Sequence, residues 1–194
     1  MTRLNSRIHE VVVTTVDVAG KPHSAPMGIS EVNGHFLIKP FKPSSTYDNL
    51  KRHRQCTINY VDDVRIIAGA LTGRRDWPVT AAEQIDGFYL ANALAHTELE
   101  ITEINDADPR ACFSGQVVCE ANHSPFRGFN RAQNAVLELA ILVSRIDWLP
   151  QKKVKQELEY LMIAMEKTAG DREWEAWQWL MEKVQAAGIE VAND

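Results

Sequence analysis

The sequence lacks the features that mark nucleic-acid-binding and disulfide-rich proteins. Its 194 residues carry 21 Lys and Arg against 26 Asp and Glu, so the formal net charge is −5. A dedicated nucleic-acid binder usually shows a strong basic excess, so we expect no nucleic-acid partner. Only three cysteines occur and none form a C-x-x-C pair, which is typical of reduced thiols in a cytosol.

Long hydrophobic runs are also missing. Residues 1–10 are polar and contain no apolar core of the kind that a signal peptide needs. The longest apolar run, residues 139–143, is far shorter than the roughly 20 residues of a membrane-spanning helix. We therefore expect a soluble, cytoplasmic protein with no membrane partner.

Several motifs of well-known enzymes are absent. The six histidines are scattered and none form H-x-x-x-H or H-E-x-x-H, so we predict no metal site. The sequence also contains no G-x-S-x-G, no G-x-x-x-x-G-K-[ST] and no G-x-G-x-x-G. Serine-hydrolase, P-loop and Rossmann interpretations therefore have no support.

What the sequence does contain is a series of short strands in its first two thirds. Residues 11–16 read VVVTTV, and Asn33-Gly34 is a strong signal for a hairpin because a type I′ turn needs positive φ at both positions. Residues 97–104 alternate between polar and apolar, as a half-buried strand does. The strands predicted in addition cover residues 23–30, 35–40, 55–61, 65–70 and 111–120.

Helical periodicity begins after residue 130. Three helices are predicted in the last third, with Gly170 in the left-handed conformation at the end of the second and Asp171 capping the third. A further short helix should start near Ser45 or Thr46 and end near Arg52. Residues 72–95 are expected to form a loop with one short helix. Strands first and helices last predict an α+β protein: a small antiparallel barrel or sandwich at 1–125, and a helical region at 126–194 that packs on it or on a partner.

The first candidate site lies where the short helix begins. Ser44, Ser45 and Thr46 are consecutive hydroxyls, and Lys42 supplies a nearby positive charge. The start of a helix offers unpaired N–H groups and a partial positive charge, so a phosphate is a natural ligand. A plain helix cap is the competing interpretation.

Two further segments have both a binding and a structural interpretation. Pro26, Met27 and Gly28 end a strand, where a missing side chain lets a flat ligand approach, or else marks a bulge. Arg127 and Arg131 stand at the start of a helix, where the dipole disfavours cations. They predict either an anionic ligand or an internal salt bridge.

In their order along the chain, the strings PMGI, KPSSTYDNL and CTINYV resemble the split-barrel flavoproteins, which include flavin reductases and pyridoxamine-phosphate-oxidase-like barrels. The strings IHEVVVTTVDVAGKPHSAPMGI and FRGFNRAQNAVLE are closer still to one subfamily, domain-of-unknown-function family 447. This resemblance implies an antiparallel split barrel with a helical C-terminal part. It also implies an FMN cofactor held at the interface of a homodimer.

Carried over to this sequence, the resemblance implies a set of FMN-binding residues from four parts of the chain. The hydroxyl run would hold the phosphate, the strand end would line the isoalloxazine ring, and an asparagine would reach the ribityl chain or the ring edge. The arginine pair would close the site. The residues are Ala25, Pro26, Met27, Gly28, Lys42, Ser44, Ser45, Thr46, Asn59, Arg127 and Arg131.

The function that follows is an FMN-dependent oxidoreductase acting on a small-molecule substrate. No acid–base residue is placed for a particular substrate, and a second nucleotide-binding motif is missing, which favours FMN over FAD. The resemblance also points to pterin-linked one-carbon metabolism. A non-catalytic flavin or nucleotide-binding module and a scaffold that binds nothing remain the alternatives, because a fold does not by itself define a function.

Overall fold

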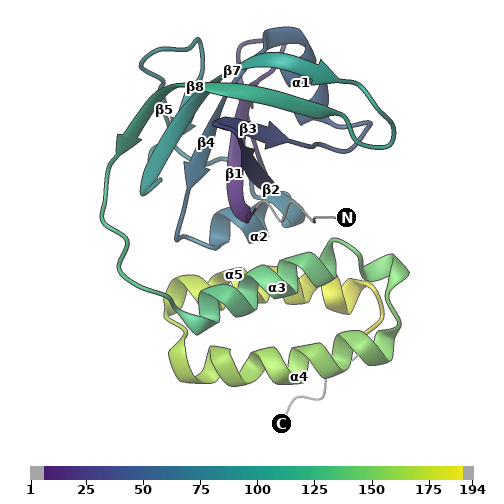
Figure 1. The fold of residues 1–194 in the computed structure, drawn as a ribbon. Coiled ribbons are helices and arrows are strands. Elements are labelled where there is room, and N and C mark those ends of the chain that lie inside the picture. Colours follow the sequence, from purple (N-terminus) through teal and green to yellow (C-terminus); the bar gives the residue numbers. More distant parts are fainter. Residues whose placement is uncertain (1–6, 190–194) are drawn as a thin grey trace. The chain divides into compact units, whose positions relative to one another are not determined.

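The computed structural model describes residues 7–189, and the chain divides into two compact units. The first unit contains Met1–Val61 and Trp77–Phe126, and the second contains Asp62–Asp76 and Arg127–Asp194. Figure 1 shows the strands in the first unit and most of the helices in the second. The predicted α+β class with an antiparallel barrel and C-terminal helices is confirmed.

The first unit is a closed barrel of six antiparallel strands. The strands are joined in the order β1-β2-β3-β8-β7-β4, and β4 pairs again with β1 to close the ring. Their bounds are β1 Ile8–Val16, β2 Pro22–Val32, β3 His35–Ile38, β4 Gln55–Tyr60, β7 Ala95–Asn105 and β8 Cys112–Asn122.

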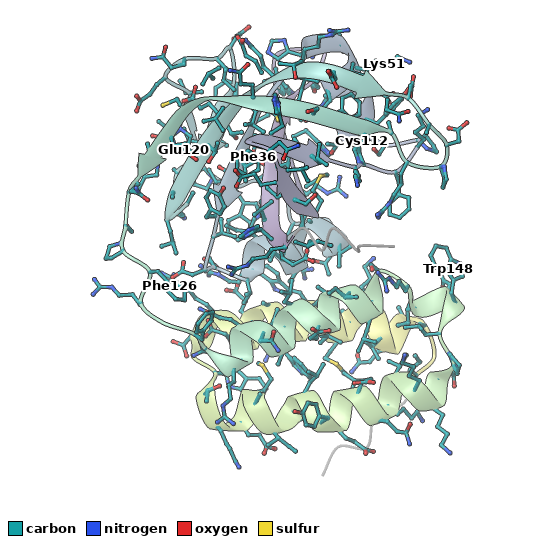
Figure 2. All side chains as sticks on the ribbon, viewed as in Figure 1. Phe36, Lys51, Cys112, Glu120, Phe126 and Trp148 are labelled. Carbon is teal, nitrogen blue, oxygen red and sulfur yellow. The ribbon has the colours of Figure 1, made fainter. Side chains whose placement is uncertain are left out.

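Apolar side chains that alternate along the strands fill the barrel (Figure 2). Val11 and Val13 of β1 face this core, and Phe36 and Phe113 are buried with them. The residues between them on the strands point to the other face, as the two-residue period of a strand requires. One sequence pattern therefore creates two environments, an apolar interior and a more polar outer face.

The turn between β2 and β3 has the conformation that its sequence predicts. Asn33 and Gly34 have φ of 53° and 77°, so both lie in the left-handed region. This is the pair of positive φ values that a type I′ turn needs. The predicted hairpin is confirmed.

The pairing of β2 is unequal along its two edges. On one edge, residues 22–30 pair with β1 without a break in register. On the other edge, β3 pairs only with Ser30, Glu31 and Val32. Within the part of the chain that the structure describes, no strand pairs with the outer edge of residues 22–29, so the barrel is split along this stretch.

The helix α1, Ser45–His53, follows β3 and belongs to the same unit. It starts at Ser45, and its N-cap is Ser44 rather than the predicted Ser45 or Thr46, because the Ser44 hydroxyl accepts a hydrogen bond from the N–H of Tyr47 at 3.2 Å. Arg54, with φ 57°, ends it in the left-handed conformation.

Two predictions for residues 65–95 are wrong. Residues 65–70 form no strand but the helix α2, Arg65–Thr72, because Val64, Ile67, Ala68 and Leu71 repeat with a helical period. The expected short helix in residues 72–95 is replaced by a two-stranded sheet of β5, Val79–Ala81, and β6, Phe88–Leu90.

The second unit is helical. It consists of α2 together with α3 Arg131–Val143, the short 3₁₀ helix η1 Ile146–Trp148, α4 Gln151–Thr168 and α5 Asp171–Ala186. The three predicted C-terminal helices are therefore present, and α3 packs against both α4 and α5. Among the described residues, no helix combines the length and apolar content needed to cross a membrane.

Ion pairs fasten α2 to α5 in the second unit. Arg65 lies 2.7 Å from the buried carboxylate of Asp63 and 2.8 Å from Glu175 of α5. At the boundary between α4 and α5, Gly170 does not adopt the predicted left-handed conformation, since its φ is −99°. It occupies the N-cap position that the sequence assigned to Asp171, and its N–H donates to Glu173 at 2.9 Å.

Gly69 of α2 tests how tightly this helix end is packed. A Cβ at Gly69 would clash with the carbonyl oxygen of Arg74, and that backbone is fixed by the hydrogen bond from Arg74 N–H to the Gly69 carbonyl at 2.9 Å. We expect Gly69→Ala to destabilise the protein by about 1–3 kcal/mol, as overpacking does. Urea unfolding measures this. The neighbouring Ala70→Ser should change stability by at most about 0.5 kcal/mol, and equal effects would contradict the packing account.

Candidate functional site

The predicted ring-binding segment lies on the split part of the barrel. Ala25, Pro26, Met27 and Gly28 all belong to the stretch of β2 whose outer edge has no strand partner among the described residues. The register with β1 is continuous here, so Gly28 does not mark a bulge. A side chain at Gly28 would instead meet Ile8 Cγ2 of β1 at 2.8 Å, which shows close packing on this strand.

The three hydroxyls at the start of α1 have three different environments. Ser44 is the helix cap, Ser45 is exposed, and Thr46 is 2% exposed. The cap interpretation therefore holds for Ser44. Ser45 and Thr46 are the first two residues of the helix, whose backbone N–H groups lack an acceptor within the helix.

Hydrogen bonds attach α1 to the ends of β1 and β2. Asn49 donates to the Thr15 hydroxyl at 3.0 Å, and that hydroxyl donates to the His23 carbonyl of β2 at 3.3 Å. A separate hydrogen bond joins β1 and β2, since the hydroxyls of Thr14 and Ser24 are 2.8 Å apart. The helix α1 is thus linked through Thr15 to His23, which lies two residues before Ala25 on β2.

Lys42 is bound to carboxylates of the β7–β8 turn. Its ammonium lies 2.5 Å from Asp106 and 3.1 Å from Asp108, and Lys51 and the Tyr47 hydroxyl both lie 2.8 Å from Asp106. The hydrogen bonds from Lys42, Lys51 and Tyr47 hold the pKa of the Asp106 carboxyl far below its usual range. The charge of Lys42 is therefore largely balanced within the chain.

Asn59 is fully buried between three elements of the barrel unit. Its amide nitrogen donates to the carbonyl of Val12 on β1 at 2.9 Å and to the Thr14 hydroxyl at 3.1 Å. Its amide oxygen accepts from the N–H of Leu90 on β6 at 2.7 Å. Both ends of the side chain are used inside the unit, so Asn59 fixes β4 to β1 and to β6.

The arginine pair belongs to the helical unit. Arg127 and Arg131 are exposed at the start of α3, and neither lies within 4 Å of a carboxylate among residues 7–189. The internal salt bridge that is the alternative interpretation of this pair is thus not formed among these residues. Arg131 lines a pocket of about 360 Å³ between α3 and α4, together with Tyr160 and Ile163. The other nine predicted residues belong to the barrel unit.

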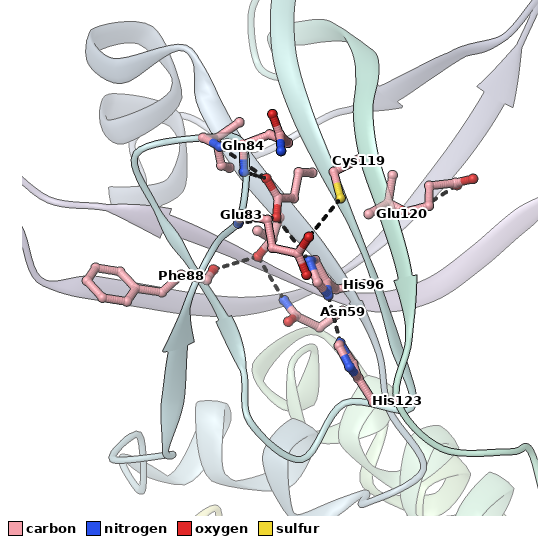
Figure 3. A network of polar contacts seen from close by, with 12 residues as sticks. Asn59, Glu83, Gln84, Phe88, His96, Cys119, Glu120 and His123 are labelled. Carbon is pink, nitrogen blue, oxygen red and sulfur yellow. Dashed lines mark hydrogen bonds and ion pairs between the residues drawn. The ribbon is translucent and has the colours of Figure 1, made fainter.

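Sequence reasoning missed a buried carboxylate on β7. Glu98 is fully buried, and it accepts hydrogen bonds from the backbone N–H groups of Glu83, Gln84 and Ile85 at 2.6 to 3.1 Å (Figure 3). Burial by itself raises the pKa of Glu98, but these three N–H groups and His96 outweigh it and lower the pKa. Glu98 thus anchors the segment before β6 to the barrel. No local signal distinguishes it from the exposed Glu100 two residues later.

The fold is shared with solved structures. An antiparallel six-stranded barrel with a short helix after the third strand also occurs in an FMN-bound protein and in an FMN-binding protein. Family models identify the family of the sequence. The model described as "Protein of unknown function (DUF447) N-terminal domain" matches residues 9–124, and that described as "Protein of unknown function (DUF447)" matches residues 130–182. The chain belongs to this family.

Solved structures resemble the chain at different extents. An FMN-bound protein of the same family from Methanosarcina mazei is 20% identical, with a TM-score of 0.79 over 93% of this chain and 96% of that one. A 2-nitrobenzoate 2-nitroreductase from Pseudomonas fluorescens is 20% identical, with a TM-score of 0.52 over 62% and 67%. An FMN-binding protein from Thermus thermophilus is 15% identical, with a TM-score of 0.51 over 62% and 74%. No curated protein matches the chain.

The role of Asn59 as the link between strands can be tested by truncation. Asn59→Ala leaves the Val12 carbonyl and the Leu90 N–H without their buried partner. Because a buried unsatisfied group costs about 1–3 kcal/mol, we expect a loss of about 2–4 kcal/mol in unfolding free energy. Asn122→Ala, at the exposed end of β8, should change it by less than about 0.5 kcal/mol. A small effect at both sites would show that Asn59 does not hold the strands.

Glu98 makes stability depend on pH. Its folded pKa lies below the ordinary value of 4.5, so its contribution is fully present above that value and is lost as the pH falls through the lower folded pKa. Glu98→Gln should therefore be less stable than the parent near neutral pH, by about 1–3 kcal/mol. The difference should shrink in acid. Urea unfolding across this range, with the exposed Glu100→Gln as control, checks it; a difference that does not vary with pH contradicts an ionised Glu98.

Proposed function

We propose that this chain binds FMN on its barrel and uses it as an oxidoreductase with a small-molecule substrate. The isoalloxazine ring would lie along the outer edge of β2 at Ala25, Pro26, Met27 and Gly28, and the phosphate at the start of α1. The observation that carries this proposal is the unpaired edge of β2 in the same region as a helix N-terminus that bears hydroxyls.

The residues present fit the two ends of FMN. Backbone groups on a strand edge that has no neighbouring strand can hydrogen-bond the polar rim of a planar heterocycle. At the other end, the helix α1 offers the N–H groups of Ser45 and Thr46 and the partial positive charge of its dipole. The exposed hydroxyl of Ser45 adds a further hydrogen-bond donor for the phosphate.

The ion pairs of Lys42 weaken the prediction that its positive charge binds the phosphate. With Asp106 and Asp108 at 2.5 and 3.1 Å, its charge is shared with two carboxylates. Its backbone N–H also donates to the Pro109 carbonyl at 3.1 Å. We infer that Lys42 chiefly fixes the segment before α1, while the helix start and its hydroxyls bind the phosphate.

Relatives support the cofactor and leave the substrate open. The M. mazei protein of the same family is described as FMN-bound, and the T. thermophilus protein as FMN-binding. The P. fluorescens structure is a nitroreductase, and the reductase component of a two-component tryptophan halogenase has a TM-score of 0.51. Bound FMN supplies the electron or hydride transfer, and this chain binds and orients it. A pterin-linked substrate stays a prediction.

We infer further that the chain acts as a homodimer in the cytoplasm. In the flavoproteins that it resembles, the flavin lies at a dimer interface, and the open edge of β2 offers a place for a second copy to complete the site. A role of Arg127 and Arg131 in closing the site stays a prediction. Light scattering after size-exclusion chromatography would give twice the chain mass of 21.9 kDa.

The phosphate assignment is tested by changing the start of α1. A Ser45→Ala, Thr46→Ala double variant should lower FMN affinity more than about tenfold, which is a loss of about 1.4 kcal/mol. Quenching of FMN fluorescence measures the affinity. The matched control is Thr80→Ala with Ser124→Ala, two exposed hydroxyls elsewhere in the same unit, which should leave it unchanged.

Because Thr46 is buried, a second variant separates binding from folding. Ser45→Asp adds a negative charge at the exposed first position of α1, where the helix dipole favours it. It should keep or raise stability and still weaken FMN binding, because it repels the phosphate. Unchanged affinity in both variants would refute the phosphate site. Flavin that binds tightly but is reduced by neither NADH nor NADPH would favour the non-catalytic module.

A further inference from the structure

A line of three polar side chains runs from the buried face of β7 to the surface of the barrel unit. The Glu98 carboxylate lies 3.1 Å from Nε2 of His96, and Nδ1 of His96 lies 2.8 Å from Nε2 of His123 (Figure 3). Glu98 and His96 are 0% and 1% exposed, whereas His123 is an exposed residue. The line therefore connects a buried charge to solvent through two imidazole rings.

The positions of the protons follow from the ionised state of Glu98. Three backbone N–H groups already point at this carboxylate, so it can only accept, and His96 must donate from Nε2. In a neutral His96, Nδ1 then carries a lone pair and accepts from Nε2–H of His123. Nδ1 of His123 is left with an outward lone pair, and it has no hydrogen-bond partner among residues 7–189.

The rings are held in one plane for this exchange. Tyr89 of β6 stacks on both rings, with centroid distances of 4.0 Å to His96 and 4.9 Å to His123 and interplanar angles of 3° and 4°. The planes of the two imidazoles are 7° from parallel, and their centroids are 5.0 Å apart. With the facing nitrogens 2.8 Å apart, this centroid distance places the rings end to end in nearly the same plane. Because the rings are coplanar, the N–H of one points along the lone pair of the other, which is the geometry that proton transfer needs.

The hydrogen bond between the rings limits the pair to one added proton. When Nδ1 of His123 gains a proton from outside, its Nε2–H can pass to Nδ1 of His96, and the positive charge then lies beside Glu98. A second proton would place two N–H groups face to face at 2.8 Å. The pair thus takes up and releases a single proton while the line stays intact.

A metal site does not explain this cluster. Within residues 7–189, no group of three or more His, Cys, Asp and Glu side chains is arranged to hold a metal ion. The facing ring nitrogens of His96 and His123 form a hydrogen bond with each other, so they do not converge on a position where an ion could bind. Hydrogen bonding, not coordination, accounts for the arrangement.

We propose that Glu98, His96 and His123 form a one-proton acid–base relay whose working atom is Nδ1 of His123. The proton moves from a ring nitrogen of the substrate to Nδ1 of His123, the N–H bond of the substrate breaks, and the reverse step returns it. The relay uses none of the residues that are proposed above to hold FMN, so its test does not depend on FMN binding.

The charges around the relay indicate the class of substrate. The titratable groups on the elements around it are Glu83 before β6, Tyr89 on β6, and Cys119 and Glu120 on β8. Burial together with Glu98, Glu83 and Glu120 raises the pKa of the Cys119 thiol, which reflects a negative field. Such a field disfavours anions. The substrate class is therefore a nitrogen heterocycle that is cationic while it carries the proton and neutral once the proton has moved to His123.

The first test locates the N–H protons of the two imidazole rings directly. Long-range proton–nitrogen NMR spectra of the full chain, at a pH where both rings are neutral, should show the proton on Nε2 of His96 and on Nε2 of His123. A proton on Nδ1 of His123 would overturn the relay, because the outward atom would then have no lone pair. His9→Asn, which removes a histidine of β1 outside the relay, should leave these signals unchanged and helps to assign them.

The second test probes the substrate class. Imidazole is titrated against the protein with acetate as the anionic counterpart, and the ring signals of His123 and His96 are followed. Imidazole should perturb them at concentrations at least about tenfold lower than acetate. His123→Asn should abolish the response at His96, whereas His9→Asn should retain it. Equal responses to the two probes, or an unchanged response in His123→Asn, would refute the site. FMN binding is measured on the same samples. A protein that fails to bind FMN but still responds to imidazole contradicts the proposed function and not the relay, and the reverse result contradicts the relay alone.

Discussion

The barrel depends on how the buried amide of Asn59 is satisfied. This side chain lies on the outer face of β4, where the strands carry polar rather than apolar residues, and it has no access to water. Its amide nitrogen has a hydrogen-bond acceptor, the Val12 carbonyl, only if β1 stays in register. Its amide oxygen has a donor, the Leu90 N–H, only if β6 covers the sheet. Since β1 and β4 share only three residue pairs, this amide strengthens the contact that closes the ring.

Closing the ring between β1 and β4 leaves the opening elsewhere. β1 is paired on both edges, by β2 and by β4, whereas the first part of β2 has only β1 as a neighbour. The open stretch includes the segment that the sequence predicts for a flavin ring. The helix that would hold the phosphate is attached to the ends of the same two strands. One pattern of strand pairing thus produces both the rigid wall and the accessible edge of the site.

The outer face of the barrel holds a second set of polar groups. Asn59 and His96 are direct neighbours across β4 and β7, so the amide that closes the barrel stands beside the relay that leads to His123. Both are covered by the segment that contains β5 and β6, which the Glu98 carboxylate holds in place. Covering this face removes water from the polar groups and fixes their hydrogen bonds.

The sequence correctly predicts those features that depend on residues close together in the chain. Asn33-Gly34 forms the expected turn because only its own φ angles matter, and the order of the motifs gives the barrel and the family. The strand prediction for residues 65–70 is wrong because the β-branched Ile66 and Ile67 favour a strand. The helical period of this segment is clear only when Val64 and Leu71 are included. The roles of residues that contact distant segments could not be predicted. Glu98 receives its donors from a segment thirteen to fifteen residues earlier, and the partner of Lys42 lies 64 residues later.

The central claim is that the open edge of β2 and the start of α1 form a site for FMN. The most direct test is the visible absorption spectrum of the purified full-length protein, before and after incubation with FMN, followed by mass spectrometry of the released chromophore. The account predicts flavin absorption bands and the mass of FMN. A protein that is colourless and takes up no added FMN, although it is folded, would contradict the account and leave Ser44–Thr46 as the start of a helix and nothing more.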